Sequence, residues 1–174
     1  MIDRTRWFLQ EPWHNAAPLI DFESALSTAE GTGFSHYWFY KLEYILWERH
    51  RQKKGEAWQN FRMTAKNSVE HVSPQKPESF DSNPVSAHVL DTFGNLALVS
   101  RSINSEYSNK PYVEKRARFH ERNAVRADSL KLSLMFENRG WNDTLANEHR
   151  QAMIAEFQAY VSDVEKEVQK LSAR

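Results

Sequence analysis

Hydrophobic positions recur at helical spacing toward both ends of the chain. Between Ser35 and Gly55, spacings of three and four residues predict a helix with one buried face, lined by Phe39, Leu42, Ile45, Leu46 and Arg49. A shorter helix is predicted from residue 17, ending at Gly31. Near the C-terminus, WNDT offers Asn142 or Asp143 as an N-cap for a long helix with an apolar stripe made by Met153, Ile154, Phe157, Tyr160, Val161, Val164, Val168 and Leu171. This stripe would pack on the core or on a partner helix.

The middle of the chain, residues 61–122, has a different pattern. Two short β-like runs, SVEHVS and NLALVS, stand on either side of a long connection that contains Pro74, Pro77 and Pro84. Within that connection VSAHVLDTFGN predicts a short helix, and Pro111 suits the first turn of a later basic helix. A further helix is predicted at SLKLSLMF. Because long irregular connections inside a compact domain are usually functional or disordered, this zone holds the candidate site.

Length and composition limit the fold class and the kinds of protein that the chain can be. A chain of 174 residues suits one domain of α+β class, mostly helical, with a helical flank over 1–60 and C-terminal helices over 123–174. Its 23 basic and 23 acidic residues exclude a basic footprint over the whole protein. The absence of cysteine excludes thiol chemistry and favours a reducing compartment. No apolar run suits a membrane span or a secretory signal, so we expect a cytoplasmic protein without membrane contact.

An acid and an imidazole stand side by side at Glu70 and His71, in the first β-like run. Alone the pair is weak evidence, because neighbours on a strand point to opposite faces and one is often only solvated. Three amides follow downstream at Asn95, Asn104 and Asn109. Amide oxygens suit magnesium and also orient imidazoles, although each asparagine alone also fits a turn or a cap.

Basic side chains concentrate just after these asparagines. A single one of them is equally well explained as part of a solvated helix face. As a group they fit phosphate contacts, which position DNA without reading its sequence, and they comprise Arg101, Lys110, Lys115, Arg116, Arg118 and Arg122. We expect nucleic-acid contacts from Arg101, Asn109, Lys110, Lys115 and Arg118.

The motifs EHVSPQ, FGNLALVSRSIN and SNKPYVEK together resemble the HNH branch of the His-Me finger nucleases. The resemblance is greatest to the C-terminal domain of the GmrSD-type modification-dependent restriction endonucleases. Order, residue types and spacing agree, and Tyr112 stands where phenylalanine is usual. The resemblance implies a ββα-metal core over 61–122, in which two short antiparallel strands and a helix grip one divalent cation.

The resemblance also implies a role for each site residue. His71 is the general base that takes a proton from water, Glu70 and Asn104 are ligands of Mg²⁺ or Mn²⁺, and Asn95 braces the finger. A bulged or twisted strand end would turn Glu70 and His71 toward one site, and Pro74 would end the strand.

The expected function is a metal-dependent DNA endonuclease or nickase in restriction or anti-phage defence. The alternative is an inactive relative that binds DNA or a partner subunit. In the restriction enzymes such a domain usually follows an N-terminal nucleotide-hydrolysing domain, which is therefore an expected partner. Nothing in the sequence identifies a pocket for a modified base.

Overall fold

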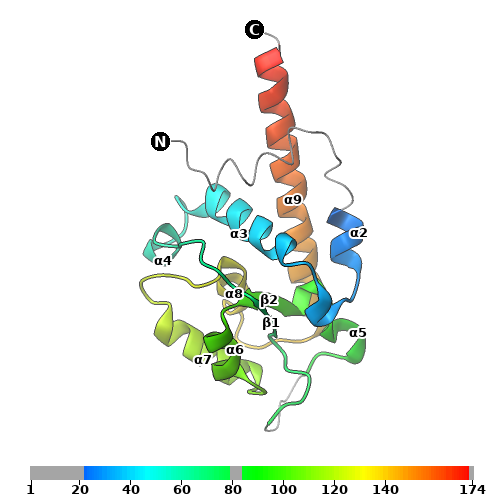
Figure 1. Cartoon of the computed structure of the whole chain (residues 1–174), viewed down its shortest axis with the longest axis vertical. Coiled ribbons are helices and arrows are strands. Elements are labelled where there is room, and N and C mark those ends of the chain that lie inside the picture. The colour runs from blue at the N-terminus through cyan, green and yellow to red at the C-terminus, as the bar shows by residue number, and fades with distance from the viewer. Residues whose placement is uncertain (1–21, 79–83, 173–174) are drawn as a thin grey trace.

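The structure, a computed structural model, describes residues 22–78 and 84–172. These residues are mostly helical and contain one small antiparallel sheet, in agreement with the predicted α+β class (Figure 1). None of the described helices is long and apolar enough to cross a membrane. The elements, in chain order, are α2 (Phe22–Ser27), η1 (Gly31–Gly33), α3 (His36–His50), α4 (Glu56–Gln59), β1 (Ser68–His71), α5 (Ala87–Leu90), η2 (Phe93–Asn95), β2 (Leu96–Val99), α6 (Arg101–Tyr107), α7 (Tyr112–Arg122), α8 (Leu130–Met135) and α9 (Asp143–Ser172).

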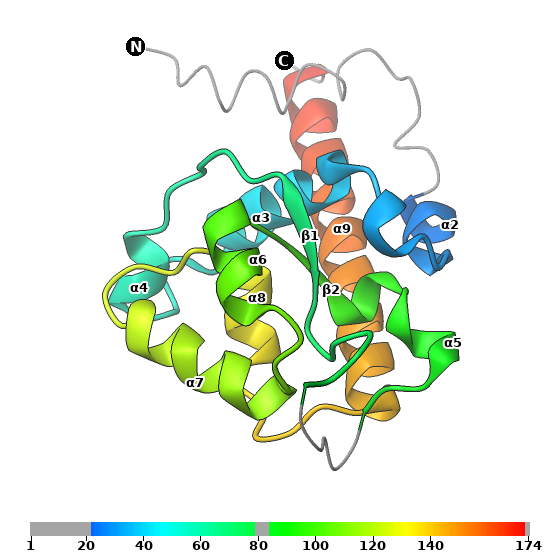
Figure 2. The same ribbon diagram turned by 60° about the horizontal axis from the view of Figure 1, so that its bottom comes forward.

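The two strands pair in regular register, with Glu70 opposite Ala97 and His71 opposite Leu96. Since side chains alternate along a strand, Glu70 and His71 leave opposite faces of the sheet. β2 is buried on both faces, with Leu96 and Leu98 in one apolar cluster and Ala97 in another. Figures 1 and 2 show α3 on one side of the sheet and α6 and α7 on the other. Of the bulged or twisted strand end that the sequence led us to expect, the bulge is absent, because the pairing from Ser68 to His71 is regular.

The two long helices confirm the periodic patterns. α3 begins directly after Ser35, and all four predicted apolar positions of its inner face are fully buried. The side chain of Asn142 accepts a hydrogen bond from the backbone N–H of Leu145 (3.0 Å), which makes it the N-cap of α9. The stripe of α9 is buried from Met153 to Tyr160, whereas Leu171 is exposed near the end that extends beyond the other described elements (Figure 1).

The shorter elements agree less completely with the predictions from the sequence. α2 ends at Ser27, before Gly31, and the predicted helical residues 17–21 lie outside the described ones. The predicted helix within VSAHVLDTFGN is confirmed as α5 and η2. Two helices were not predicted, α4 and α6. The second is capped by Ser100, whose hydroxyl accepts a hydrogen bond from the N–H of Ile103 (3.3 Å).

Gly94 allows α9 to lie directly against η2. A Cβ atom at Gly94 would come within 2.1 Å of the carbonyl oxygen of Ala146, a backbone atom that cannot swing away. We expect Gly94→Ala to lower the free energy of unfolding by about 1–3 kcal/mol or more, since the two elements must separate. Gly140→Ala is the matched control, because a Cβ atom there would meet open space. Chemical denaturation of both variants measures the effect, and equal stability would contradict this close approach.

Candidate functional site

A polar pocket of about 240 Å³ lies along β1. Val69, Glu70 and His71, which are consecutive residues of β1, all line it. This is possible because β1 is paired on one side only, so its other edge is open to the pocket. Side chains that leave opposite faces of β1 therefore still border one space. The remaining lining comes from η1, α6, α7 and the loops, and the full set is Thr32, Val69, Glu70, His71, Pro74, Gln75, Asn104, Ser108, Asn109 and Lys115.

A buried ion pair forms one wall of the pocket. The ammonium of Lys115, on α7, donates to Glu70 Oε1 at 2.5 Å and to the backbone carbonyl oxygen of His71 at 2.7 Å. The side chains of Lys115 and Glu70 are only 1% and 6% exposed. Burial raises the pKa of the Glu70 carboxyl, and Lys115 acts in the opposite direction. The pair fixes α7 to β1 and places a positive charge against the carboxylate.

His71 is held by a carboxylate from a distant part of the chain. Its Nε2 lies 2.7 Å from Oδ1 of Asp91, which directly follows α5. Because a carboxylate only accepts hydrogen bonds, this contact places the imidazole proton on Nε2 and leaves Nδ1 as the proton acceptor. Burial lowers the pKa of His71 although Asp91 opposes the shift, and this favours the neutral imidazole.

Gly31 holds Asp91 from the other side. Its backbone N–H donates to the backbone oxygen of Asp91 (3.0 Å), and its φ of +54° lies in the left-handed region that favours glycine. A Cβ atom at this position would lie 2.8 Å from Oδ1 of Asp91. The carboxylate that contacts His71 therefore depends on a glycine at position 31.

Asn95 lies beneath the pocket and does not line it. Its Oδ1 accepts from the N–H of Ser73 (2.9 Å) and from the indole of Trp141 (3.0 Å). Its Nδ2 donates to the backbone oxygens of Ser73 (3.1 Å) and Leu90 (2.9 Å). The side chain is fully buried and joins the chain after β1 to the end of α5 and to the segment before α9.

A buried lysine supports the turn that carries Asn95. The ammonium of Lys131, on α8, donates to the backbone oxygens of Phe93 (2.8 Å) and Leu96 (2.6 Å). Burial lowers the pKa of Lys131 to about 7. α8 is itself capped by Glu43 of α3, which accepts from the N–H of Leu130 at 2.7 Å. These contacts connect η2 and β2 to the helices behind the sheet.

Asn104 and Asn109 both border the pocket, as the sequence led us to expect for a shared site. Asn104 lies on α6 and Asn109 in the loop before α7. The loop is tied to the proline-containing connection by the N–H of Glu78, which donates to the backbone oxygen of Asn109 (2.9 Å), and by Ser108, whose hydroxyl donates to the Glu78 carboxylate (3.2 Å). The loop and the connection thus close one end of the pocket together.

The predicted DNA-contact residues are divided between the pocket and the surface. Lys115 is buried inside the pocket and does not lie on an exposed face of α7. Arg101 is exposed at the start of α6, Lys110 lies 3.8 Å from Glu78, and Arg118 lies 3.7 Å from Glu106. None of these three lines the pocket.

Two oxygen donors at the pocket are the side chains that could hold a hard divalent cation. No group of three or more His, Cys, Asp or Glu side chains gathers among residues 22–78 and 84–172. One carboxylate, from Glu70, and one amide, from Asn104, instead border the same polar pocket. Magnesium binds such oxygen donors and keeps several waters. Glu70 is also paired with Lys115, so a cation would have to share this carboxylate with the ammonium.

Two residues of the site network were missed from the sequence. Asp91 lies within the segment VSAHVLDTFGN, where the sequence predicts a short helix, and an acid there carries no spacing signal of its own. Trp141 stands out in the sequence only as part of a helix start, yet its indole donates to Asn95 (3.0 Å). Both contacts join residues far apart in sequence, so only the tertiary arrangement reveals them.

Fold and pocket define a small helical α+β domain with a polar site at the edge of its sheet. The chain belongs to the family of GmrSD restriction endonuclease C-terminal domains, whose family model matches residues 20–156. This confirms the resemblance to the C-terminal domain of the GmrSD-type restriction endonucleases, and membership in a restriction endonuclease family implies DNA as the substrate. Searches among curated proteins and among solved structures gave no significant match.

Proposed function

We propose that this protein is a divalent-metal-dependent endonuclease of HNH type that hydrolyses DNA phosphodiester bonds in a restriction system. The observation that carries the proposal is the pocket itself, because Glu70 and His71 from one motif and Asn104 from another border one space. The carboxylate, imidazole and amide are the groups that metal-assisted hydrolysis of a phosphodiester requires. Membership in a restriction endonuclease family supports the same chemistry.

The proton acceptor in this mechanism is Nδ1 of His71. With Nε2 bonded to Asp91, Nδ1 takes a proton from a water that attacks the phosphorus in line with the leaving oxygen. Glu70 and Asn104 would hold Mg²⁺ or Mn²⁺, which when bound neutralises charge on the phosphate and the leaving oxygen. Asn95 positions the strand end through its contacts with Ser73.

Lys115 contributes within the site and not as an outer phosphate contact. Its ammonium keeps the Glu70 side chain at the wall of the pocket through a 2.5 Å contact and adds positive charge beside the place of the phosphate. A fixed positive charge in a site shielded from water stabilises negative charge that develops during cleavage. Arg101, Asn109, Lys110 and Arg118 remain proposed contacts to the DNA backbone.

The proposal is tested by nicking of supercoiled plasmid DNA with Mg²⁺, with Mn²⁺ and with a chelator. We expect cleavage with either metal and none with the chelator. DNA binding without cleavage under every metal condition would instead identify a binding module that has lost catalysis. Plasmids with and without modified cytosine extend the assay to the choice of target.

Asp91 is a positioning residue in this mechanism. Asp91→Ala removes the group that orients His71, so we expect kcat for nicking to fall about 10- to 100-fold, the range found when a partner that orients an imidazole is lost. KM for DNA should stay unchanged because Asp91 does not line the pocket. The ¹⁵N shifts of the His71 ring should report a change of tautomer. Asp91→Glu should restore part of the rate, and an unchanged ring spectrum in Asp91→Ala would contradict the assignment.

A further inference from the structure

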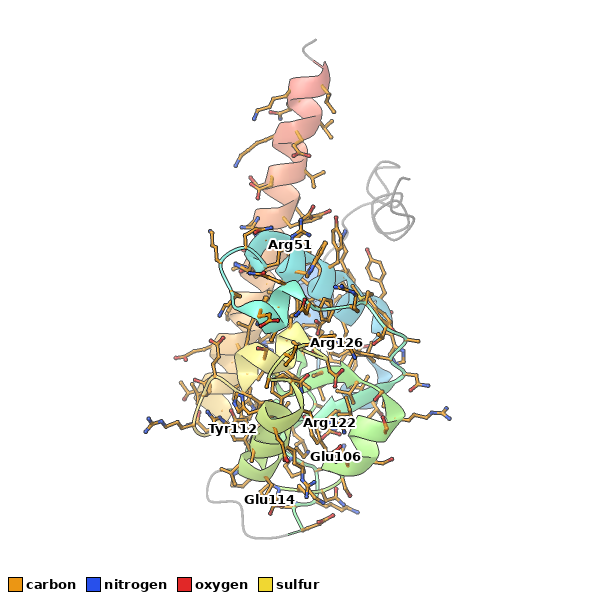
Figure 3. All side chains as sticks on the ribbon, turned by 90° about the vertical axis from the view of Figure 1, so that its left-hand side faces the viewer. Arg51, Glu106, Tyr112, Glu114, Arg122 and Arg126 are labelled. Atoms are coloured by element: carbon orange, nitrogen blue, oxygen red, sulfur yellow. The ribbon has the colours of Figure 1, made fainter. Side chains whose placement is uncertain are left out.

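A second pocket, of about 540 Å³, lies at the far end of α7. Three arginines from three parts of the chain contribute to it: Arg62 after α4, Arg122 at the end of α7 and Arg126 in the loop that follows. Figure 3 shows Arg122 and Arg126 on one face of the molecule, with Glu106 beside Arg122. The lining also includes Asn60, Val125 and Asp128.

Two hydrogen bonds fix the loop that carries Arg126 to α4 and to the residue that follows it. The N–H of Ala127 donates to the backbone oxygen of Ala57 (3.0 Å), and the side-chain amide of Asn60 donates to the backbone oxygen of Val125 (3.2 Å). These contacts hold the wall of the pocket in place before any ligand arrives, which lowers the entropic cost of binding.

The charges of the pocket match a singly charged anion. Arg122 is paired with Glu106, a carboxylate outside the lining that also lies 3.7 Å from Arg118 and therefore offsets part of the charge of Arg122. Arg62 and Arg126 have no ion pair with any residue that the structure describes, and Asp128 is the acid of the lining. Two guanidinium groups against one carboxylate leave at least one positive charge, which is enough to neutralise the single negative charge of a phosphodiester.

The distance to the first pocket agrees with a continuous nucleic-acid strand. Arg122 follows Lys115 by seven residues on α7, about 10 Å at a helical rise of about 1.5 Å per residue. Along the axis of a DNA duplex this length corresponds to about three base-pair steps, at about 3.4 Å each. The side chain of Val125, 62% exposed at the rim, offers an apolar contact to a sugar or base.

We propose that the pocket formed by Arg62, Arg122 and Arg126 binds a backbone phosphodiester of the DNA about three nucleotides from the one that is cleaved. The inference rests on the proposed function and adds a second, separate contact to the substrate. It explains why an arginine-rich pocket stands at the opposite end of the helix that delivers Lys115 to the first pocket. The contact reads the backbone and not the bases.

The test compares binding of a fluorescent DNA duplex across a salt series, with a chelator present so that no cleavage occurs. The combined variant Arg62→Ala and Arg126→Ala should bind about 10- to 100-fold more weakly, with the slope of log affinity against log salt reduced by about 2. The matched control combines Arg139→Ala and Lys170→Ala, two exposed residues that line neither pocket. The control should bind like the wild type.

Two further measurements separate this pocket from the site of cleavage. Arg126→Lys should keep most of the salt slope, because the charge remains, whereas Arg126→Glu should reduce affinity more than Arg126→Ala. Wild-type affinity and salt slope in the combined variant would overturn the inference, and so would a wild-type protein that binds no DNA. A protein that binds DNA through this pocket but cleaves under no metal condition would refute only the proposed hydrolysis.

Discussion

Replacing His71 with Ala should reduce strand cleavage about 100- to 10,000-fold while DNA binding and metal binding persist. The variant removes the proton acceptor but leaves Glu70, Asn104 and Lys115 at the wall of the pocket. Asp91 loses one hydrogen-bond partner but stays partly exposed to water, so the fold should tolerate the change. Single-turnover nicking, a binding isotherm and a thermal melt on the same preparation measure the three effects.

The pH dependence of the cleavage rate is a second test of the general-base role of His71. A general base acts in its neutral form, and burial lowers the pKa of His71 below 6.5. The wild-type rate should therefore be flat above neutral pH and fall as the pH drops through that pKa. The residual activity of His71→Ala should lack this acid limb. His88→Ala, at an exposed position of α5, is the control and should keep both rate and profile. Equal nicking by folded His71→Ala and wild type would refute the general-base role.

Much of the fold could be predicted because the spacing of apolar residues along the chain reflects which face of each element is buried. The run LALV is uninterrupted because β2 separates two apolar clusters, and α3 shows its stripe because one face meets the core. α4 and α6 were missed because four and seven residues are too few for a periodic signal. Their positions depend on caps and on tertiary packing.

The site could be predicted only as far as its motifs extend. Glu70, His71 and Asn104 were expected to share a site, and the pocket brings them together. Lys115 looks in the sequence like part of a solvated basic face, because its burial depends on an ion pair with a residue 45 positions away. Asp91 was missed for a similar reason, since it lies 20 positions from His71 and in a different element. Motif spacing locates such a site, but the charged partners behind it follow from the fold.

Replacing Glu70 should abolish metal binding and also cost stability, and the two effects can be separated. Glu70→Ala removes the carboxylate donor and leaves the ammonium of Lys115 buried without that partner. Breaking a buried ion pair in this way costs about 3–5 kcal/mol. Glu70→Gln keeps the shape of the side chain and an oxygen acceptor for Lys115, so it should be better tolerated. Both variants should cleave DNA orders of magnitude more slowly, because charge neutralisation at the phosphate is lost.

Calorimetric titration with Mn²⁺ in the absence of DNA distinguishes a lost ligand from a damaged fold. We expect no resolved binding in Glu70→Gln, weakened binding in Asn104→Ala and wild-type binding in Glu114→Gln, which changes an exposed carboxylate on the same helix as Lys115. Circular dichroism and denaturation of each variant show that the comparison is made between folded proteins. Unchanged Mn²⁺ affinity in folded Glu70→Gln and Asn104→Ala would contradict the ligand assignment. The Mn²⁺ ion would then have to be held by groups other than Glu70 and Asn104.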